Sequence, residues 1–470
     1  MDSRKLVVIG AGPGGYAAAF LAADLGIKTT LIDTEINPGG VCLYKGCIPS
    51  KALLHIANVI SEAESAKIFG VEFGKPGIDI NKMRSWKEDV VTKLTSGLGS
   101  LSKQRKIEYI RGEAKFVNSD SLEIIKEDKT LKTINFENVI IATGSSPAVI
   151  PGLSIKSPNV LDSTSALNLN DIPKSMLIIG GGYIGLELGT VYAALGTEIT
   201  VAEMLPRLMN GADEDLVAVL SKNLNNIFES VRLNTKVSEL KEVEKGISIT
   251  FEDKDAKRTD NFFDKVLICV GRKPNSKNLN LENTKVNIDE NGFVIVDKQM
   301  RTGDKNIFAI GDVVGEPMLA HKASHEGRVA AEVIAGHKSV FDPETIPAVV
   351  FTDPEIAWCG LTEARAKSEK RNVTVAKFPW AASGRALTIG RTDGLTKLII
   401  DSESERILGV GIVGKGAGDL ISEGVLAIEM GANATDLKLT IHPHPTLSET
   451  LMESAEVFFG QSTHVYKPKK

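Results

Sequence analysis

Two cysteines in a glycine-bounded segment are the residues of this chain best suited to chemistry. The segment Gly39–Lys51 reads GGVCLYKGCIPSK, with Cys42 and Cys47 five residues apart. In a regular helix their Cα atoms would be about 8.6 Å apart, whereas a disulfide needs a separation below roughly 7 Å. If the thiols pair, the segment must depart from a regular helix, and Gly46 permits this because it lacks a Cβ atom. Two unrelated buried thiols are the alternative.

A histidine-rich stretch near the C-terminus is the second candidate for chemistry and reads IHPHPTLSE over residues 441–449. Pro445 suits the first turn of a helix, which would place His444 at the helix edge and Glu449 about one turn in. A carboxylate that holds an imidazole fixes its tautomer and raises its basicity, so the pair could be a general base. Metal binding by His442 and His444 is a weaker alternative, because the prolines after them restrict the geometry. A surface repeat without a role is another.

The first element that could position these residues is a nucleotide-binding unit at the start of the chain. An apolar run over Lys5–Ile9 ends in the pattern Gly-x-Gly-x-x-Gly, formed by Gly10, Gly12 and Gly15. A helical pattern follows, and then a second strand that ends at Asp33. Gly10 would make the turn, Gly12 would admit a pyrophosphate, and Gly15 would let helix meet strand. Asp33 is predicted to accept a hydrogen bond from a ribose hydroxyl.

The same unit returns later in the chain. A strand pattern at 176–179 leads into Gly180, Gly182 and Gly185, and a second strand ends at Glu203. Two complete fingerprints predict two dinucleotides, one a flavin and the other a nicotinamide, because a redox enzyme needs a donor and an acceptor. A third match at residues 409–414 lacks the later strand and acid, so we interpret it as β structure in another domain.

Further strand ends suggest where the domains begin and end. The run 139–142 closes at Thr143-Gly144, and the run 266–270 closes at Gly271-Arg272. From residue 345 the pattern becomes β-rich and carries no nucleotide signature. We therefore predict an α/β fold with a discontinuous first nucleotide domain (1–148 and 272–344), an inserted second one (149–271) and a third domain (345–470). Asp312 follows a short strand and could reach a cofactor hydroxyl, and a helix begins near Ala320.

Composition narrows the class of protein. The 470 residues carry a net charge of −5 without blocks of like charge, which argues against nucleic acid or an anionic membrane as a main partner. No apolar run reaches the roughly 18 residues of a membrane span, and no leader pattern precedes the first strand. Four cysteines fit a reducing compartment, so we expect a cytoplasmic protein. In that setting a close cysteine pair is more often catalytic or metal-binding than structural.

These motifs together resemble the dihydrolipoamide dehydrogenase family of pyridine nucleotide–disulfide oxidoreductases. The resemblance covers essentially the whole chain and rests on Gly39–Lys51, both fingerprints, CVGRKPN at 269–275, IFAIGD at 307–312 and HPHPTLSE at 442–449. It implies an FAD domain split by an inserted NAD domain, followed by an α+β dimerisation domain. It also implies FAD and NAD as cofactors, and a lipoylated E2 or glycine-cleavage H protein as partner.

The resemblance assigns roles by motif position. Cys42 would be the interchange thiol, and Cys47 would lie against the flavin as the charge-transfer thiolate. His444, oriented by Glu449, would be the acid–base for the cysteine pair of the other subunit of a homodimer. Lys51 would pair with Glu187 beside the flavin. The predicted FAD contacts are Gly10, Gly12, Gly14, Gly15, Asp33, Lys51, Thr143, Gly144, Asp312 and Ala320, and the predicted NAD contacts are Gly180, Gly182, Gly185, Glu187, Glu203 and Gly271.

Three positions depart from the family pattern. Val41 replaces the usual Thr, Tyr44-Lys45 replaces Asn-Val between the cysteines, and His442-Pro443 replaces His-Ala. Because Lys45 adds a positive charge near the pair, we expect it to lower the thiolate pKa and raise the potential of the disulfide.

Related reductases and a flavin-binding protein without catalytic activity are the alternative functions. Glutathione reductases use NADPH, but Glu203 should repel a 2′-phosphate, and only Arg207 is basic nearby. Related mercuric and thioredoxin reductases carry a C-terminal redox pair, whereas the last cysteine here is Cys359, which we expect to be inert like Cys269. A flavin-binding regulator without turnover would not need both cysteines together with His444 and Glu449. The sequence does not decide which lipoyl-dependent complex is served.

Overall fold

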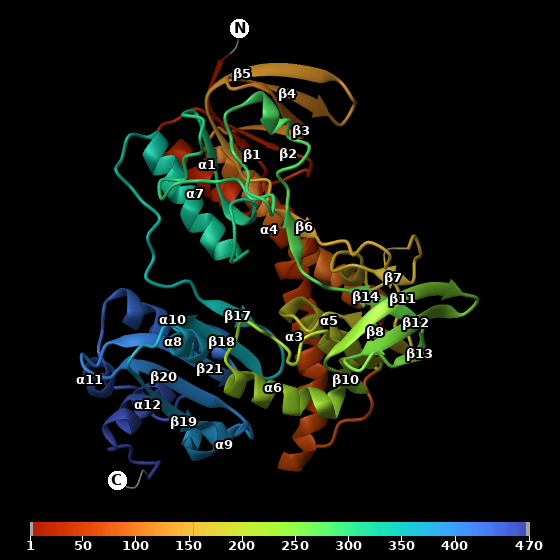
Figure 1. The fold of residues 1–470 in the computed structure, drawn as a ribbon, viewed down its shortest axis with the longest axis vertical. Helices are drawn as coiled ribbons and strands as arrows, with labels where there is room; N and C mark the ends of the chain where they lie inside the picture. Colours follow the sequence, from red (N-terminus) through yellow and green to blue (C-terminus); the bar gives the residue numbers. More distant parts are fainter. Residues whose placement is uncertain (1–2, 154, 467–470) are drawn as a thin grey trace.

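The computed structural model describes residues 3–153 and 155–466. Three parts are visible in Figure 1: one with the N-terminal strands at the top, one with the middle of the sequence at the lower right, and one with the C-terminal third at the lower left. None of the helices in the described ranges is long and apolar enough to cross a membrane.

The upper part is built on a six-stranded sheet whose centre is parallel. Strand β1 lies between β2 and β5, both parallel to it, and β16 extends the sheet beyond β5. The long strands β3 and β5 leave the parallel region and pair with β4 in an antiparallel meander. The strands are β1 (Ser3–Ile9), β2 (Thr29–Asp33), β3 (Glu108–Asn118), β4 (Ser121–Lys126), β5 (Leu131–Ile141) and β16 (Ile307–Ala309).

Helices α1 (Pro13–Asp24) and α7 (Ala320–Ile334) lie against each other beside this sheet (Figure 1). Their backbones approach closely, because a Cβ atom at Gly14 would come within 2.9 Å of the Ala323 carbonyl oxygen. A Cβ atom at Gly327 would likewise lie 2.5 Å from the Gly14 carbonyl oxygen. Small residues on both helices therefore bring the start of α7 next to the first glycine loop.

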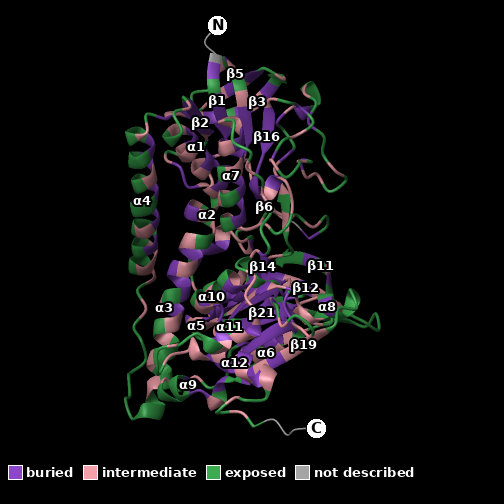
Figure 2. Cartoon of the chain, turned by 90° about the vertical axis from the view of Figure 1, so that its left-hand side faces the viewer, coloured by how far each residue is buried: buried purple, intermediate pink, exposed green. Residues whose placement is uncertain are grey.

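The cysteine segment forms the short helix α2 (Gly40–Lys45) and the start of the long helix α3 (Cys47–Ser65). Helix α3 runs downward from the upper part and is followed by a 3₁₀ turn, η1 (Ala66–Phe69). Helix α4 (Ile80–Gln104) lies along the outside of the molecule, where much of its surface is exposed (Figure 2). Its buried Lys87 donates a 2.7 Å hydrogen bond to the Leu167 carbonyl oxygen, which ties α4 to the middle of the sequence.

The middle part repeats the nucleotide-binding construction. Its parallel sheet has the order β10-β9-β8-β14-β7, and an antiparallel three-stranded sheet extends from it. Helix α5 (Tyr183–Ala194) follows β8, and α6 (Glu214–Ile227) precedes β10. The strands are β7 (Val160–Leu161), β8 (Ser175–Ile179), β9 (Glu198–Ala202), β10 (Ser230–Arg232), β11 (Thr235–Val243), β12 (Gly246–Asp253), β13 (Arg258–Phe263) and β14 (Lys265–Ile268).

The chain passes between these two parts twice, and the two passages pair with each other. Strands β6 (Ser145–Pro147) and β15 (Arg272–Pro274) form an antiparallel ribbon between the parts (Figure 1). Three-residue 3₁₀ turns follow at η3 (Leu281–Asn283) and η4 (Gly311–Val313).

The C-terminal part is a five-stranded antiparallel sheet with the order β17-β18-β21-β20-β19. Strand β21 contains the third glycine pattern, so its interpretation as β structure in a different domain is confirmed. The strands are β17 (Ala348–Val350), β18 (Glu355–Gly360), β19 (Val373–Pro379), β20 (Leu395–Asp401) and β21 (Ile407–Gly414). The helices are α8 (Glu363–Ser368), α9 (Gly384–Thr388), α10 (Ala417–Glu429), α11 (Ala434–Leu439) and α12 (Glu449–Phe459).

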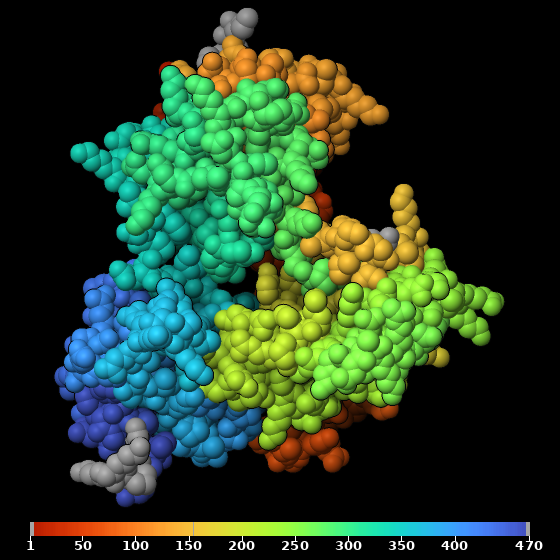
Figure 3. Space-filling model, viewed as in Figure 1, coloured from red at the N-terminus to blue at the C-terminus, as the bar shows by residue number. Residues whose placement is uncertain are grey.

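A cluster of ion pairs around a buried lysine joins the middle and C-terminal parts. The Lys397 side chain on β20 is 1% exposed, and its Nζ lies within 2.6–2.8 Å of three carboxylates. Asp213 and Asp215 bring two of them from the start of α6, and Glu363 brings the third from α8. In the space-filling view the surface is hollowed where the upper part meets the two lower ones (Figure 3).

Candidate active site

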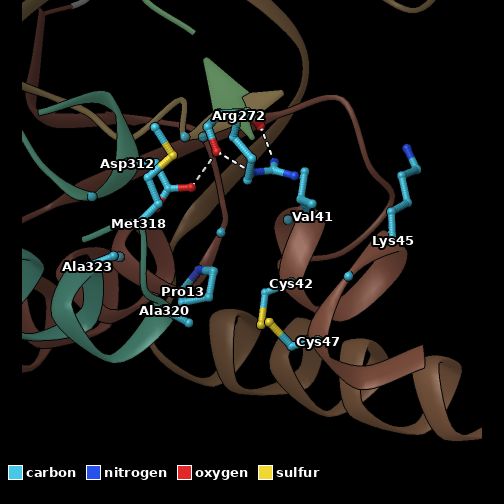
Figure 4. A pocket seen from close by; sticks show the side chains of 18 of the residues that line it. Pro13, Val41, Cys42, Lys45, Cys47, Arg272, Asp312, Met318, Ala320 and Ala323 are labelled. Carbon is cyan, nitrogen blue, oxygen red and sulfur yellow. Dashed lines mark hydrogen bonds between the residues drawn. The ribbon is translucent and has the colours of Figure 1, made fainter. Parts of the chain in front are cut away.

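The cysteine segment breaks its helix where the spacing requires it. Helix α2 ends at Lys45, Gly46 adopts φ −149° and ψ −111°, and α3 begins at Cys47. A Cβ atom at Gly46 would lie 3.0 Å from the Val41 carbonyl oxygen, so the close passage of the chain favours glycine there. The predicted departure from a regular helix is confirmed. The sulfur atoms of the two cysteines face each other in the pocket (Figure 4).

The two thiols differ in acidity because they share a hydrogen bond. The thiol of Cys42 donates to Cys47, and this bond together with the nearby Lys51 charge lowers the pKa of Cys47 to about 7, against the opposing effect of burial. The same hydrogen bond, with burial, raises the pKa of Cys42 far above its ordinary value. The first thiolate of the reduced pair therefore lies on Cys47.

Lys51 is fixed by groups from two other parts of the fold. Its Nζ lies 2.8 Å from Glu187 Oε2 on α5 and 4.6 Å from the ring centre of Phe351, just after β17. The other carboxylate oxygen of Glu187 accepts a 2.9 Å hydrogen bond from the Phe351 backbone nitrogen. Glu187 is 3% exposed, and each of its carboxylate oxygens has a polar partner. It therefore holds the Lys51 ammonium group beside the cysteines.

The charge of Lys45, which we expected to lower the thiolate pKa, is paired with a carboxylate, and its effect on the potential of the disulfide stays a prediction. The Lys45 Nζ lies 2.6 Å from Glu35 Oε1 on the surface. The lysine that lowers the pKa of Cys47 is Lys51 instead. The physical reason is the direction of the side chains, because Lys45 leaves the end of α2 toward the loop after β2. Its neighbour Tyr44 donates to the Asn37 carbonyl oxygen of that loop at 3.1 Å.

All of the predicted FAD contacts line a single cavity together with both cysteines. Glu187, which we predicted among the NAD contacts, lines the same cavity. Its lining includes Gly10, Gly12, Gly14, Gly15, Asp33, Cys42, Cys47, Lys51, Thr143, Gly144, Glu187, Asp312 and Ala320. The ends of β1, β2, β5 and β16 converge there, as expected for the carboxyl edge of a parallel sheet.

The first glycine loop is shaped for close contact with the neighbouring strand. Gly10 has φ +97°, and a Cβ atom there would lie 2.3 Å from the Ala142 carbonyl oxygen. Asp33 Oδ2 accepts from the Ala11 nitrogen at 2.6 Å, and Oδ1 accepts from the Glu35 nitrogen at 2.9 Å. Burial raises the pKa of Asp33 despite these bonds. Each oxygen keeps a second lone pair, so acceptance from a ribose hydroxyl remains compatible with this geometry.

The second loop reproduces this construction. Gly180 has φ +107°, and a Cβ atom there would lie 2.3 Å from the Cys269 carbonyl oxygen. Glu203 accepts from the Gly181 nitrogen at 2.6 Å and from the Leu205 nitrogen at 2.8 Å. Gly182 and Gly185 lie at the start of α5, and Gly271 follows β14 with φ +114°. The glycines of the loop and Glu203 belong to the β8–α5–β9 unit, and Gly271 lies beside it after β14. Glu187 is also on α5, but its carboxylate pairs with Lys51.

A polar network around Asp312 was only partly visible in the sequence. Asp312 Oδ2 accepts from Ser145 Oγ at 2.5 Å, and Ser145 Oγ accepts from Arg272 Nε at 2.7 Å (Figure 4). Arg272 Nη2 also donates to the Ser145 carbonyl oxygen at 2.6 Å. The ribbon β6–β15 is thus tied to the cofactor cavity. Arg272 belongs to the CVGRKPN motif, but no local signal marked Ser145.

His444 and Glu449 form the predicted pair. His444 Nδ1 lies 2.9 Å from Glu449 Oε1, and Glu449 Oε2 accepts from the Thr446 nitrogen at 2.8 Å. Burial works to raise the pKa of Glu449, but these two hydrogen bonds outweigh it and the pKa is lowered. The helix begins later than expected, at Glu449 itself, because residues 444–448 form a turn closed by the Thr446 bond. Among the described residues, neither His444 nor Glu449 lines the cysteine cavity of its own chain.

The residues present fit a flavin dinucleotide in this cavity. The glycine-lined side leaves room, since a Cβ atom at Gly12 would meet nothing closer than 3.9 Å and one at Gly144 nothing within 4 Å. The start of α1 supplies free backbone nitrogens for a pyrophosphate. Asp33 and Asp312 line the cavity with carboxylates, and Lys51 lines it with an ammonium group. Fold and site together define an oxidoreductase with two dinucleotide-binding units and an adjacent pair of thiols.

Comparison with known proteins names this class. The family described as pyridine nucleotide-disulphide oxidoreductase matches residues 4–327, and its dimerisation domain matches residues 346–455. The chain belongs to this family, and its C-terminal part is the dimerisation domain, which supports a homodimer. The family description names a pyridine nucleotide and a disulfide, which agrees with the two glycine loops and the cysteine pair of this chain.

Full-length relatives carry a more specific name. The chain is 49% identical over 466 residues to the dihydrolipoyl dehydrogenase of Vibrio cholerae, which covers 99% of this chain and 98% of the relative. It is 46% identical over 461 residues to the enzyme of that name from Geobacillus stearothermophilus, covering 98% and 97% of the two chains.

Solved structures support the same fold. The Cu(II) complex of the HOCl-induced flavoprotein disulfide reductase RclA from Escherichia coli is 28% identical, with a TM-score of 0.87 over 97% of this chain and all of that one. LpdA from Mycobacterium tuberculosis has a TM-score of 0.89 at 23% identity, covering 97% and 99% of the two chains, and supports the fold alone.

Proposed function

We propose that the chain is a dihydrolipoyl dehydrogenase, which uses the Cys42–Cys47 pair and FAD to oxidise dihydrolipoyl groups and reduce NAD⁺. The observation that carries the proposal is that both cysteines and every predicted FAD contact line the same cavity. The full-length relatives of that name favour dihydrolipoyl groups over other dithiols. NAD⁺ rather than NADP⁺ follows from Glu203, whose carboxylate at the second loop repels a 2′-phosphate.

The difference in acidity between the thiols supports their separate roles. In the oxidised protein, one sulfur of the dithiol attacks Cys42 Sγ, and the Cys42–Cys47 bond breaks. Cys47 leaves as the thiolate, which its low pKa and the Lys51 charge stabilise. The second substrate sulfur then displaces Cys42, which departs as a thiol, so the product is a disulfide and the cysteine pair holds two electrons. Bound FAD would supply the redox chemistry by which this electron pair reaches NAD⁺ as a hydride.

The base for the first attack is proposed to come from the second subunit. His444 is oriented by Glu449, and its side chain is 75% exposed in the single chain. Since it belongs to the dimerisation domain and lies outside its own cysteine cavity, we infer that it reaches the cysteine pair across the homodimer. It would take a proton from the incoming dithiol and return it to Cys42.

Partner and setting follow from the same proposal. The dihydrolipoyl group would be presented by a lipoylated E2 or a glycine-cleavage H protein, and the four-cysteine composition suits the reducing cytoplasm. The FAD domain is proposed to comprise residues 1–148 and 272–344, the NAD domain 149–271 and the dimerisation domain 345–470. The residues predicted from the sequence to contact FAD and NAD are proposed in the same roles here, except that Glu187 is proposed to hold Lys51 rather than NAD.

The decisive experiment compares the two cysteines in the flavin-loaded protein. With dihydrolipoamide and no NAD⁺, we expect a long-wavelength thiolate–flavin absorption band in the wild type. Cys42→Ser should keep this band and lose turnover, because the Cys47 thiolate remains. Cys47→Ser should lose both. A band that survives in Cys47→Ser and disappears in Cys42→Ser would reverse the roles, and a wild type inactive with dihydrolipoamide would refute the function.

A further inference from the structure

The loop between β2 and α2 borders the cofactor cavity and is held by residues that the chemistry described so far does not use. This β2–α2 loop comprises residues 34–39, of which Thr34 and Glu35 line the cavity beside Asp33. The Glu35 backbone nitrogen donates to Asp33 Oδ1 at 2.9 Å. The position of Glu35 therefore helps to orient the carboxylate proposed above as the acceptor for a ribose hydroxyl.

Glu35 is fastened at two further points, from two neighbouring elements. The hydroxyl of Tyr109 on β3 donates to the Glu35 carbonyl oxygen at 3.0 Å. From the other side, Lys45 Nζ at the end of α2 lies 2.6 Å from Glu35 Oε1. The backbone of Glu35 is thus held by β3, and its carboxylate is held by α2.

Tyr44 fastens the later half of the loop to the same helix. Its hydroxyl accepts a hydrogen bond from the Asn37 nitrogen at 3.3 Å and donates one to the Asn37 carbonyl oxygen at 3.1 Å. Its ring lies close to the last residue of the loop, since a Cβ atom at Gly39 would be 3.1 Å from the ring carbon Cε2. The ring and the hydroxyl therefore both contact the β2–α2 loop.

Helix α2 connects the β2–α2 loop to the first glycine loop. The helix reads GVCLYK, so Tyr44 and Lys45 are its polar side chains apart from the Cys42 thiol, and both reach the β2–α2 loop. At its start, Gly40 packs on the glycine loop, where a Cβ atom would lie 2.4 Å from Gly12 Cα. The helix that carries Cys42 thus contacts both loops proposed to bind the ribose and pyrophosphate of FAD.

We propose that Tyr44 and Lys45 are positioning residues for FAD, which hold the β2–α2 loop closed and thereby fix Glu35 and Asp33 on the ribose side of the cavity. Since the family pattern has Asn-Val at these two positions, neither the tyrosine hydroxyl nor the ammonium group comes from that pattern. The proposal rests on FAD as the cofactor of the proposed function, and it does not depend on which dithiol is the substrate.

The expected effect follows from the population of the closed loop. If FAD binds with full affinity only when the loop is closed, its apparent Kd rises as the closed fraction falls. One hydrogen bond typically changes an equilibrium constant by a factor of about two to ten. Tyr44→Phe loses both bonds to Asn37 and should raise the Kd of FAD roughly tenfold. Lys45→Met loses one partly exposed ion pair and should raise it roughly threefold.

The test measures the Kd of FAD without any turnover. Flavin-loaded protein is diluted in steps, and the released FAD is separated by ultrafiltration and quantified by its absorbance. Lys45→Arg keeps a cation for Glu35 and should bind FAD as the wild type does. In a Glu35→Gln background, Lys45→Met should cause no further loss of affinity, because the partner through which it acts has been removed. A further loss there overturns the role of Glu35.

Two variants serve as matched controls. Tyr192→Phe removes a hydroxyl that donates to the Ala166 carbonyl oxygen at 2.8 Å in the middle part. Lys5→Met breaks an exposed ion pair with Glu137 at 2.5 Å, near the start of β1 and away from its carboxyl end. Each control loses the same kind of interaction outside the β2–α2 loop, so both should keep the wild-type Kd of FAD.

The outcomes separate this proposal from the proposed function. A Kd of FAD within about twofold of the wild type in both Tyr44→Phe and Lys45→Met overturns the positioning role. An equal loss of NAD⁺ affinity also overturns it, since that result indicates general damage rather than an open loop. If the wild type retains FAD but does not oxidise dihydrolipoamide, the proposed function fails, and the FAD affinities still decide the role of Tyr44 and Lys45.

Discussion

Replacing Cys42 by alanine tests the account of the cysteine pair most directly. The largest cause of the low pKa of Cys47, about 7 against an ordinary 9.0, is the hydrogen bond from the Cys42 thiol. Without this donor, burial and the Glu187 carboxylate both raise the pKa of Cys47, and the Lys51 charge and a backbone hydrogen bond are left to lower it. We therefore expect the pKa of Cys47 in Cys42→Ala to rise by roughly two units or more.

Cys42→Ser is the matched variant, because a hydroxyl still donates a hydrogen bond. Its Cys47 pKa should stay within about one unit of the wild type. In the reduced, flavin-free wild type we expect Cys47 to lose its proton as the pH rises through about 7, in a single step that forms one thiolate per chain. The pKa of Cys42 lies far above this range because of the same hydrogen bond.

Thiolate absorbance at 240 nm measures the titration without interference from the remaining cysteines. Burial raises the pKa values of Cys269 and Cys359 to about 12, so neither ionises below pH 10. The rate of alkylation of Cys47, followed by peptide mass analysis, gives the same midpoint independently. A Cys42→Ala variant that still titrates near pH 7 would refute the reasoning and assign the low pKa to Lys51 alone.

Two further predictions concern lysines. Lys45→Val should shift the pKa of Cys47 by less than about 0.3 unit in the same titration, because the Lys45 ammonium is paired with Glu35; a shift of one unit would restore the expectation based on its place between the cysteines. Lys397→Met should destabilise the protein by about 3–5 kcal/mol, because three carboxylates lose their buried partner. Urea unfolding followed by the fluorescence of the three tryptophans, of which Trp380 is fully buried, measures this effect. The control is Lys377→Met, which should cost about 1 kcal/mol or less because the Lys377 side chain is 39% exposed.

Local patterns were sufficient for the two dinucleotide units. Gly10 and Gly180 each follow a short parallel strand and adopt positive φ, and the acid at the end of the next strand bonds the loop in both units. These demands arise between residues close in sequence, so strand, turn, helix and acid can be recognised without the fold. The decoy at 409–414 was excluded on the same basis, since it lacked the following strand and acid.

Charge effects at the cysteines could not be predicted from spacing. Lys45 is two residues from Cys47, yet its side chain leaves toward Glu35, whereas Lys51 is turned inward by Glu187 from a helix 136 residues away. A pKa depends on burial and on distances in space. The start of α12 at Glu449 was misplaced for a related reason, because the turn before it is closed by the Glu449 side chain itself.

The sequence by itself determined the chemistry available to this protein, namely a cysteine pair with a glycine break, two nucleotide loops and a histidine with its carboxylate. These signals are short-range, because they reflect the backbone geometry and hydrogen bonds of neighbouring residues. Only the tertiary structure decided which groups act together. It brought Cys42, Cys47, Lys51 and Glu187 to one cavity, left His444 outside that cavity in its own chain, and buried His442 against Glu423. Long-range packing sets these contacts, and no spacing along the chain encodes them.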